Sequence, residues 1–266
     1  MGRRLANSAM LCAWFAAVLV TACAAASDAR AACGSTSLGD ARVAAIADSR
    51  TIRLDDGRLA KLAGIEWTVP AEAATAALSE LMLNRTVSLK GNLTPDRYGR
   101  IYTFPSVSGS ETPVQYALIE RGLAVMGRPE DKACAQALLE REHAARAARL
   151  GVWNSGERQH GANDPKEVLR DHGRFAIVEG RVLSVRESGS LIYVNFGPRW
   201  SEDFTVTIAK RNEPTFIKGG LAPKSLSGRD VRVRGFVEER SGPWIEATSP
   251  EQFEVMAAQS TSSRGK

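Results

Sequence analysis

The sequence is poor in the residues from which metal sites are most often built. Its 266 residues include only three histidines and four cysteines. His143, His160 and His172 lack the short, regular spacing of zinc ligands, so no zinc site is expected and all three are predicted to lie on the surface. Hydrophobic residues make up 44% of the chain and charged residues 24%, which is typical of a globular protein with an apolar core.

Long apolar runs are also missing, except near the start of the chain. Arg3 and Arg4 precede an uncharged apolar run at residues 10–22, which is too short to span a bilayer and typical of a secretory signal peptide. Two processing sites follow. The segment ending at Cys23 resembles a lipobox, which would place a lipid on that cysteine, and residues 29–31 form an Ala-x-Ala cleavage site.

A signal peptide at residues 1–31 predicts an exported protein that is periplasmic or secreted, or a lipoprotein anchored to the membrane through Cys23. Its removal takes away three arginines and one aspartate and lowers the formal net charge from +5 to +3. This mild positive charge permits an anionic partner without requiring one.

Export also reduces the number of available cysteines. Cys12 leaves with the signal peptide, and Cys23 is either removed or lipidated. Cys33 and Cys134 remain, and an even pair in an oxidising compartment predicts a disulfide. The alternative is two unrelated free thiols.

Residues 40–153 are predicted to form a domain in which short strands alternate with three helices. The turn signal Asp55-Asp56-Gly57 favours a hairpin between the second and third strands. The expected strands lie at residues 41–47, 51–54, 58–65, 86–90 and 100–107. The expected helices lie at residues 71–84, 114–122 and 131–150.

The composition changes after this domain. Residues 154–173 are rich in Gly, Asn and Asp and are predicted to be a linker, and residues 257–266 are predicted to be a disordered tail. Residues 174–256 form a β-rich domain, with strands expected at 175–185, 191–196, 204–208, 230–238 and 244–247. Gly180 inside the first of these strands indicates a bulge or a sharp bend, so the predicted fold is a small OB-type barrel.

Valine and arginine alternate in the fourth strand of this second domain. The pattern predicts a buried valine face and a basic face that carries Arg232 and Arg234. OB-type barrels bind single strands through basic and aromatic side chains, and the aromatic candidates are Tyr193, Trp200 and Phe236. The alternative is that Tyr193 and Trp200 pack in the core while the arginines are solvated. Barrels of this type also bind sugars and proteins.

The most specific motif of the first domain is the basic turn Asp96-Arg97-Tyr98-Gly99-Arg100. It occurs in order with several further motifs, which are Asp48-Ser49-Arg50-Thr51, Lys61-Leu62-Ala63-Gly64-Ile65-Glu66 followed by Pro70, Arg121-Gly122-Leu123-Ala124 and Leu150-Gly151-Val152-Trp153. Together these motifs resemble the thermonuclease (staphylococcal nuclease-like) family over about residues 40–153. The resemblance implies a five-stranded OB-type barrel capped by three helices, and hydrolysis of nucleic acid phosphodiesters with calcium.

Such hydrolysis builds negative charge on phosphate oxygens, which cationic side chains and a carboxylate-bound calcium ion stabilise. By resemblance, Lys61 and Arg100 match the two family arginines, and Arg100 is also open to a structural role paired with Asp96. Glu66 matches a calcium-ligating aspartate. By the same resemblance, Arg50 takes the position of another calcium-ligating aspartate. The alternative is that Arg50 is a solvated loop residue with no role in the site.

The glutamate that positions or activates the attacking water in the family is missing from this sequence. Its position is taken by Val69 or, if a two-residue insertion is allowed, by Ala71 beside Glu72. A unit positive charge about 4 Å from a divalent cation costs roughly 8 kcal/mol at an effective dielectric of about 20. Because Arg50 brings such a charge and also replaces a carboxylate ligand, the sequence predicts that the calcium site is lost.

The sequence therefore predicts an exported protein of this family that binds nucleic acid, with hydrolysis weakened by a degenerate site. The candidate catalytic residues are Lys61, Glu66 and Arg100. The candidate nucleic-acid-binding residues are Arg50, Arg97, Tyr98, Arg232 and Arg234. The alternative is a non-enzymatic binding or scaffold module of the cell envelope that holds a protein or glycan.

Overall fold

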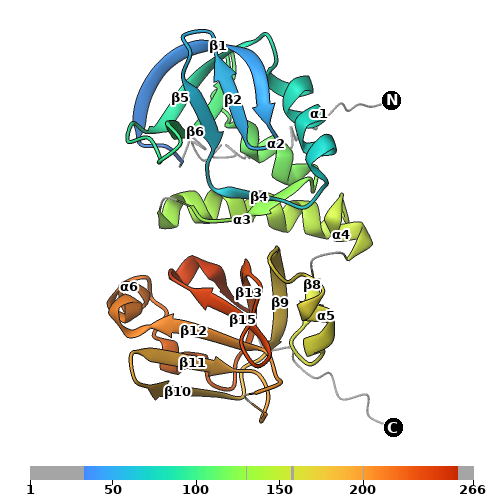
Figure 1. Ribbon diagram of the computed structural model, residues 1–266, viewed down its shortest axis with the longest axis vertical. Helices are drawn as coiled ribbons and strands as arrows, with labels where there is room; N and C mark the ends of the chain where they lie inside the picture. The colour runs from blue at the N-terminus through green and yellow to red at the C-terminus, as the bar shows by residue number, and fades with distance from the viewer. Residues whose placement is uncertain (1–32, 130, 157–158, 200, 257–266) are drawn as a thin grey trace, which may run out of the picture.

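The computed structural model describes residues 33–129, 131–156, 159–199 and 201–256. These residues form two domains stacked along the long axis of the molecule (Figure 1). The expected signal peptide, the lipid site at Cys23, the C-terminal tail and Trp200 lie outside the described residues. Within the described ranges, no helix is long and apolar enough to cross a membrane.

The first domain is built on a closed barrel in the strand order β1-β2-β3-β6-β5. Strand β1 pairs with both β2 and β5, so the single long strand closes the barrel, and register shifts bend it on the way. The barrel strands are β1 (Thr36–Asp48), β2 (Thr51–Leu54), β3 (Leu59–Leu62), β5 (Thr86–Asn92) and β6 (Arg100–Val107). The predicted five-stranded barrel is confirmed. The predicted hairpin turn is also present, with Gly57 at a φ of 88°.

Three helices pack against this barrel, as the sequence predicts. They are α1 (Ala71–Met82), α2 (Val114–Glu120) and α3 (Lys132–Ala147). Asp131 caps α3, because its Oδ1 accepts a hydrogen bond from the Cys134 backbone N–H at 2.9 Å. A two-stranded sheet of β4 (Ile65–Trp67) and β7 (Ala124–Met126), which the sequence pattern does not predict, links the barrel to α3.

The predicted disulfide is confirmed. Cys33 and Cys134 are bonded, and both are fully buried in the apolar core of the first domain. The bond closes a loop across a sequence separation of 101 and joins the start of the described chain to the first turn of α3.

The second domain contains two sheets in place of the single closed barrel expected from the sequence. One sheet has the order β10-β11-β12-β15-β14, and the other has the order β16-β13-β9-β8. Their strands are β8 (Gln159–Gly161), β9 (Phe175–Arg181), β10 (Ser184–Ser188), β11 (Leu191–Asn195), β12 (Thr205–Ala209), β13 (Asp230–Phe236), β14 (Glu238–Glu239), β15 (Pro243–Ala247) and β16 (Phe253–Val255). Helix α5 (Pro165–Leu169) lies between β8 and β9, and helix α6 (Glu213–Lys218) lies between β12 and β13. Short 3-10 turns occur at Lys210–Asn212, Pro223–Leu226 and Pro250–Gln252.

Two expectations for this region need correction. The predicted strand 175–185 is divided, because the chain leaves β9 after Arg181 and enters the other sheet as β10. Gly180 pairs in unbroken register with Val231, so it marks no bulge. It is instead a close-packing position, since a Cβ there would lie 2.6 Å from the Ala162 Cβ.

The predicted linker is also structured where it is described. It contains the end of α4 (Val152–Ser155), strand β8 and helix α5, and β8 pairs with β9 of the second domain. His160 in β8 is largely buried, and its Nε2 lies 2.8 Å from the Asp171 carboxylate, so the predicted surface position of this histidine is wrong. The segment thus extends the second domain toward the first.

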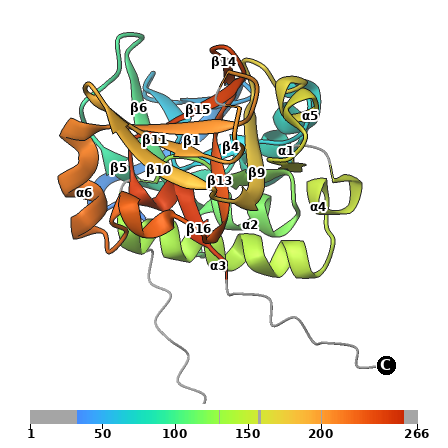
Figure 2. The same cartoon turned by 90° about the horizontal axis from the view of Figure 1, so that it is seen from below.

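Helix α3 lies between the two domains, with β13 and β16 of the second domain against it (Figures 1 and 2). An apolar cluster crosses the same boundary. Val125 and Trp153 from the first domain pack with Ile177 from β9, and Phe175 adds to the cluster. The two domains therefore share buried apolar surface as well as polar contacts.

Candidate active site and the interface that covers it

The sequence-predicted residues Arg50, Lys61 and Glu66 come together in one cleft between the domains. The cleft has a volume of about 680 Å³. Its first-domain wall is formed mainly by β3, β4 and the adjoining loops, and its second-domain wall by residues near β13, β14 and β15. The polar and aromatic lining residues are Arg50, Lys61, Glu66, Asn92, Tyr102, Arg128, Phe175, Phe236, Glu238, Glu246, Thr248 and Gln252.

Arg50 and Glu66 form an ion pair inside this cleft. The Arg50 Nη2 lies 2.6 Å from the Glu66 Oε2, and the Glu66 side chain is only 14% exposed. This oxygen has no well-aligned hydrogen bond within the described residues, so the contact is mainly Coulombic. The turn before β2 fixes Arg50, because its backbone N–H donates to the Asp48 Oδ1 at 2.7 Å. Arg50 thus lines the cleft and has a carboxylate partner there, with its side chain 37% exposed.

Lys61 lies beside the aromatic ring of Tyr102, which is not among the residues predicted from the sequence. Strands β3 and β6 run parallel with Lys61 opposite Tyr102, and the Lys61 Nζ lies 5.0 Å from the centre of the Tyr102 ring. Tyr102 is 36% exposed. The signal that could have found it is its alternation with Arg100 along the same strand.

Arg100 is held within its own turn. Its Nε donates to the Asp96 Oδ2 at 2.9 Å, and its Nη2 lies 2.8 Å from the same oxygen. The Asp96 Oδ1 accepts hydrogen bonds from the backbone N–H groups of Tyr98 and Arg100. The Arg100 guanidinium lowers the pKa of the Asp96 carboxyl to about 2. Gly99 allows the turn to close with a φ of 75°.

The side chains of Arg97, Tyr98 and Arg100 form an exposed basic and aromatic cluster on this turn. The Tyr98 side chain is 61% exposed. The guanidinium carbons of Arg97 and Arg100 lie 4.8 and 5.0 Å from the centre of its ring. Arg97, Tyr98 and Arg100 do not line the cleft, so the structure divides the predicted site into the cleft and this adjoining turn.

Residues 67–155 match the model of the family described as staphylococcal nuclease homologue. The chain therefore carries a staphylococcal nuclease-like domain. No curated protein matches the chain. The matched segment includes Arg97, Tyr98 and Arg100, whereas Arg50, Lys61 and Glu66 precede it and belong to the site through the geometry of the barrel and cleft.

No carboxylate takes the place of the family's catalytic glutamate among the described residues that line the cleft near α1. Val69 is half-buried before α1, and Ala71 and Glu72 are exposed in the first turn of that helix. None of the three lines the cleft. Glu72 is therefore not positioned to assist Glu66.

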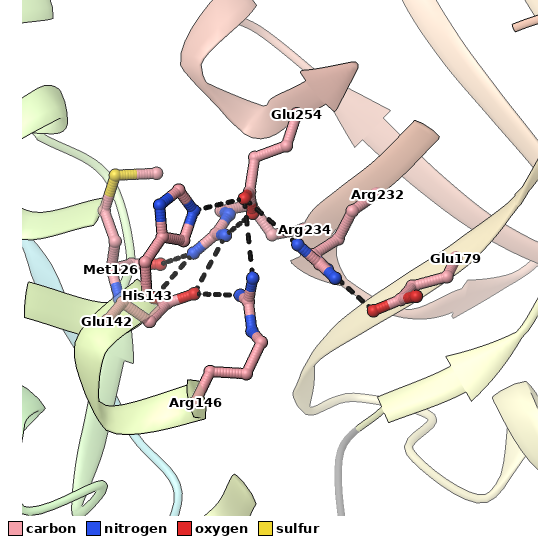
Figure 3. A network of polar contacts seen from close by, with 8 residues as sticks. All are labelled: Met126, Glu142, His143, Arg146, Glu179, Arg232, Arg234 and Glu254. Atoms are coloured by element: carbon pink, nitrogen blue, oxygen red, sulfur yellow. Dashed lines mark hydrogen bonds and ion pairs between the residues drawn. The ribbon is translucent and has the colours of Figure 1, made fainter. Parts of the chain in front are cut away.

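Arg232 and Arg234 require correction as nucleic-acid-binding residues. Both lie on β13, but the face that carries them packs on the nuclease-like domain (Figure 3). Arg234 is completely buried and donates to the Glu142 Oε2 at 2.9 Å, the Glu142 Oε1 at 3.1 Å and the Met126 carbonyl at 3.1 Å. Arg234 and Arg232 both also bind Glu254.

The surroundings of these arginines form an interdomain ion network. Arg232 pairs with Glu179 at 2.7 Å, and Arg146 pairs with Glu142 at 2.7 Å. His143 completes the network through a 2.8 Å contact between its Nε2 and the Glu254 Oε2. Because every guanidinium here has a carboxylate partner, β13 has no free positive charge to offer a phosphate.

The network also sets the protonation of its carboxylates and guanidiniums. Burial alone would raise the pKa of Glu254. The charge of Arg234, the hydrogen bond with His143 and the charges of Arg232 and Arg146 outweigh it and lower that pKa to about 2. Burial likewise opposes the charged form of Arg234, yet Glu142 and Glu254 raise its pKa. The Glu254 carboxylate and the Arg234 guanidinium are therefore both charged at neutral pH.

Proposed function

We propose that this protein binds nucleic acid through the basic turn of its nuclease-like domain and does not hydrolyse it in a calcium-dependent manner. The observation that carries the proposal is the Tyr98 ring, which is 61% exposed and flanked by the guanidiniums of Arg97 and Arg100. An exposed ring offers a stacking platform for a base, and the adjacent guanidinium of Arg97 offers a phosphate contact.

The cleft residues support the loss of calcium from this site. Calcium prefers six to eight oxygen ligands, and several of these are normally carboxylates. Glu66 is the single carboxylate on the first-domain wall of the cleft, and Arg50 neutralises it at 2.6 Å. Over the described residues, no three Asp, Glu, His or Cys side chains gather where they could hold a metal. This donor set does not fit calcium.

The two carboxylates of the opposite wall do not change this assessment. Glu238 and Glu246 face the cleft from the second domain, so its three cations, Arg50, Lys61 and Arg128, are balanced by three carboxylates. A balanced cleft attracts a polyanion less strongly than the exposed turn does. The proposal therefore places strand binding at the turn, with Lys61 and Tyr102 at the edge of the same surface.

The test is binding of fluorescent single-stranded DNA and RNA over a range of salt, beside nuclease assays with a panel of divalent metals. Wild type should bind with an affinity that falls as salt rises. Tyr98→Ala should weaken binding by about five- to 150-fold, given about 1–3 kcal/mol per stacked base. Arg97→Ala should weaken it by up to about fivefold, given up to about 1 kcal/mol for an exposed charge contact. Arg170→Ala, which alters a 74% exposed arginine of the second domain, is the matched control.

Robust calcium-dependent cleavage would overturn the loss of hydrolysis. Absence of strand binding even at low salt would overturn the binding role and favour the second candidate, a non-enzymatic binding or scaffold module of the cell envelope. The balanced charge of the cleft is the observation that favours this candidate, because a neutral protein or glycan surface needs no excess of cations.

We also propose that the protein acts outside the cytoplasm, either free in the periplasm or secreted, or anchored to the membrane through a lipid on Cys23. The buried Cys33–Cys134 disulfide supports this location, because such bonds persist in oxidising compartments. Fractionation of cells that express the wild type and Cys23→Ala tests it. Recovery in the cytoplasmic fraction would contradict export, and an unchanged membrane fraction in the variant would contradict the lipid.

A further inference from the structure

The outer face of the second domain's five-stranded sheet carries a separate pocket of about 200 Å³. It lies over β11, β12 and β15, where Tyr193 stands opposite Thr207 and Thr205 stands opposite Trp244. The alternate residues of these strands, such as Val194 and Val206, point to the core and are fully buried. The pocket residues therefore occupy the face of the sheet that would otherwise be expected to meet solvent.

Three polar atoms in this pocket lack partners. The hydroxyls of Thr205 and Thr207 and the indole Nε1 of Trp244 are buried, and none has a hydrogen-bond partner within the described part of the chain. Thr207 is 2% exposed and Trp244 is 5% exposed. Buried polar groups are nearly always hydrogen-bonded. Three unpaired atoms in one pocket therefore indicate that a bound ligand supplies their hydrogen-bond partners.

The charge of the pocket selects among possible ligands. Its charged lining residues are Asp203 and Arg240, one of each sign. Arg240 pairs with Glu238 at 3.4 Å and stacks on the Trp244 ring, with its guanidinium carbon 3.3 Å from the ring centre. A nucleic acid strand needs a track of cations for its phosphates, and this pocket provides none.

We propose that this pocket binds a single neutral sugar unit, free or as part of a glycan. Its hydroxyls would satisfy the two threonines and the indole N–H, which donates only. Its apolar ring face would lie against the Tyr193 ring, since the Arg240 guanidinium stacks on Trp244. The volume equals that of about six or seven liquid waters, which suits one sugar ring and is too small for a long segment of chain.

The test is an NMR titration of the protein labelled with ¹⁵N-tryptophan, with the Trp244 indole signal assigned by Trp244→Phe. The probes are neutral hexoses, N-acetylhexosamines and their short oligomers, beside an oligothymidylate. At least one sugar should move the Trp244 signal with a Kd in the roughly millimolar range and leave the Trp153 signal in place. The oligothymidylate should not move the Trp244 signal.

Thr207→Val is the decisive variant because it removes a hydroxyl that has no hydrogen-bond partner among the described residues. It should weaken sugar binding by about tenfold or more and leave the unfolding midpoint unchanged or raised. Thr68→Val is the matched control, since the Thr68 hydroxyl donates to the Gly122 carbonyl at 3.1 Å. It should lower the midpoint and keep sugar binding.

Three results would overturn the proposal. They are a Trp244 signal that no sugar moves, sugar binding that Thr207→Val leaves intact, and a Trp244 signal that responds to the oligothymidylate in place of the sugars. Each is independent of whether the basic turn of the nuclease-like domain binds nucleic acid, since that turn lies in the other domain.

Discussion

Arg234 of the second domain binds the Glu142 carboxylate of the nuclease-like domain with two hydrogen bonds of 2.9 and 3.1 Å, and both side chains are completely buried. The two residues are 92 positions apart in the chain. A planar fork of this kind fixes both the distance and the angle between the elements that carry it. The interdomain arrangement is therefore a defined part of the fold, and its strength can be measured.

Replacing Arg234 with Met should lower the free energy of unfolding by about 3–5 kcal/mol, because the buried Glu142 would lose one of its two guanidinium partners and keep only Arg146. Urea denaturation followed by tryptophan fluorescence measures the loss. Arg181→Met is the control, since Arg181 is 70% exposed and 3.6 Å from Asp230, and it should cost less than about 1 kcal/mol. Equal losses in the two variants would contradict a special role for the buried pair.

The low pKa of Glu254 predicts loss of stability in acid. Its pKa is lowered from an ordinary 4.5 to about 2, so the folded state favours the carboxylate. The stabilisation is complete above pH 4.5 and is lost as the pH falls toward 2, and it amounts to about 3 kcal/mol at about 1.4 kcal/mol per pKa unit. Glu254→Gln should flatten the stability profile in this window, and Glu239→Gln, which alters an exposed residue, should not. Parallel profiles for wild type and Glu254→Gln would refute the assignment.

Removing the disulfide should destabilise the first domain strongly. The bond closes a loop over a sequence separation of 101, for which the chain-entropy argument gives about 4.7 kcal/mol, and typical measured losses are about 2–5 kcal/mol. The double variant Cys33→Ser/Cys134→Ser avoids a free thiol and should unfold at lower urea concentration. A reducing agent should lower the midpoint of the wild type and leave that of the double variant unchanged, whereas an unaffected wild type would show that the bond does not form.

Reversing the charge at residue 50 should improve the binding of calcium. Arg50→Asp places a second carboxylate beside Glu66, where the ion pair now lies. Calcium at about 10 mM should then raise the melting temperature of the variant and leave that of the wild type unchanged, because weak calcium sites have a Kd near 10⁻⁴–10⁻³ M. Arg53→Asp, also on β2 but exposed, should show no calcium effect. A calcium response in the wild type as large as in Arg50→Asp would contradict the role given to the Arg50–Glu66 pair.

The parts of the site that the sequence predicts well are those formed by local contacts. Asp96 and Arg100 are four positions apart, so their pairing follows from the turn itself. Lys61 and Glu66 are brought to the cleft by neighbouring short strands whose order follows from the family resemblance. The barrel and its three helices follow from the same resemblance, whereas the disulfide, which joins residues separated by 101 positions, is predicted from the two cysteines that remain after export.

The parts that the sequence predicts poorly depend on contacts between domains. The alternation in β13 correctly places Val231 and Val233 in the core, since both are fully buried. It also places Arg232 and Arg234 on the opposite face, but it cannot tell whether that face meets water or another domain. The partner that decides this, Glu142, lies in a helix whose own pattern is typical of a solvated surface.

The same limit applies to the cleft. Phe236 and Glu246 line its second wall, and nothing in their own segments indicates that Arg50 and Lys61 lie opposite them. The two-sheet arrangement of the second domain was missed for a related reason. Short edge strands such as β14 and β16 are too brief to give a periodic signal.

The apolar cluster at the domain boundary has a consequence for any attempt to divide the gene. The family match ends at residue 155, which suggests a natural place to cut. A fragment ending there would keep Val125 and Trp153 but lose Ile177, which covers them. Such a fragment would expose an apolar patch and aggregate. Recombination at this point would therefore yield two poorly behaved fragments. Selection is therefore expected to act on both domains as one inherited unit.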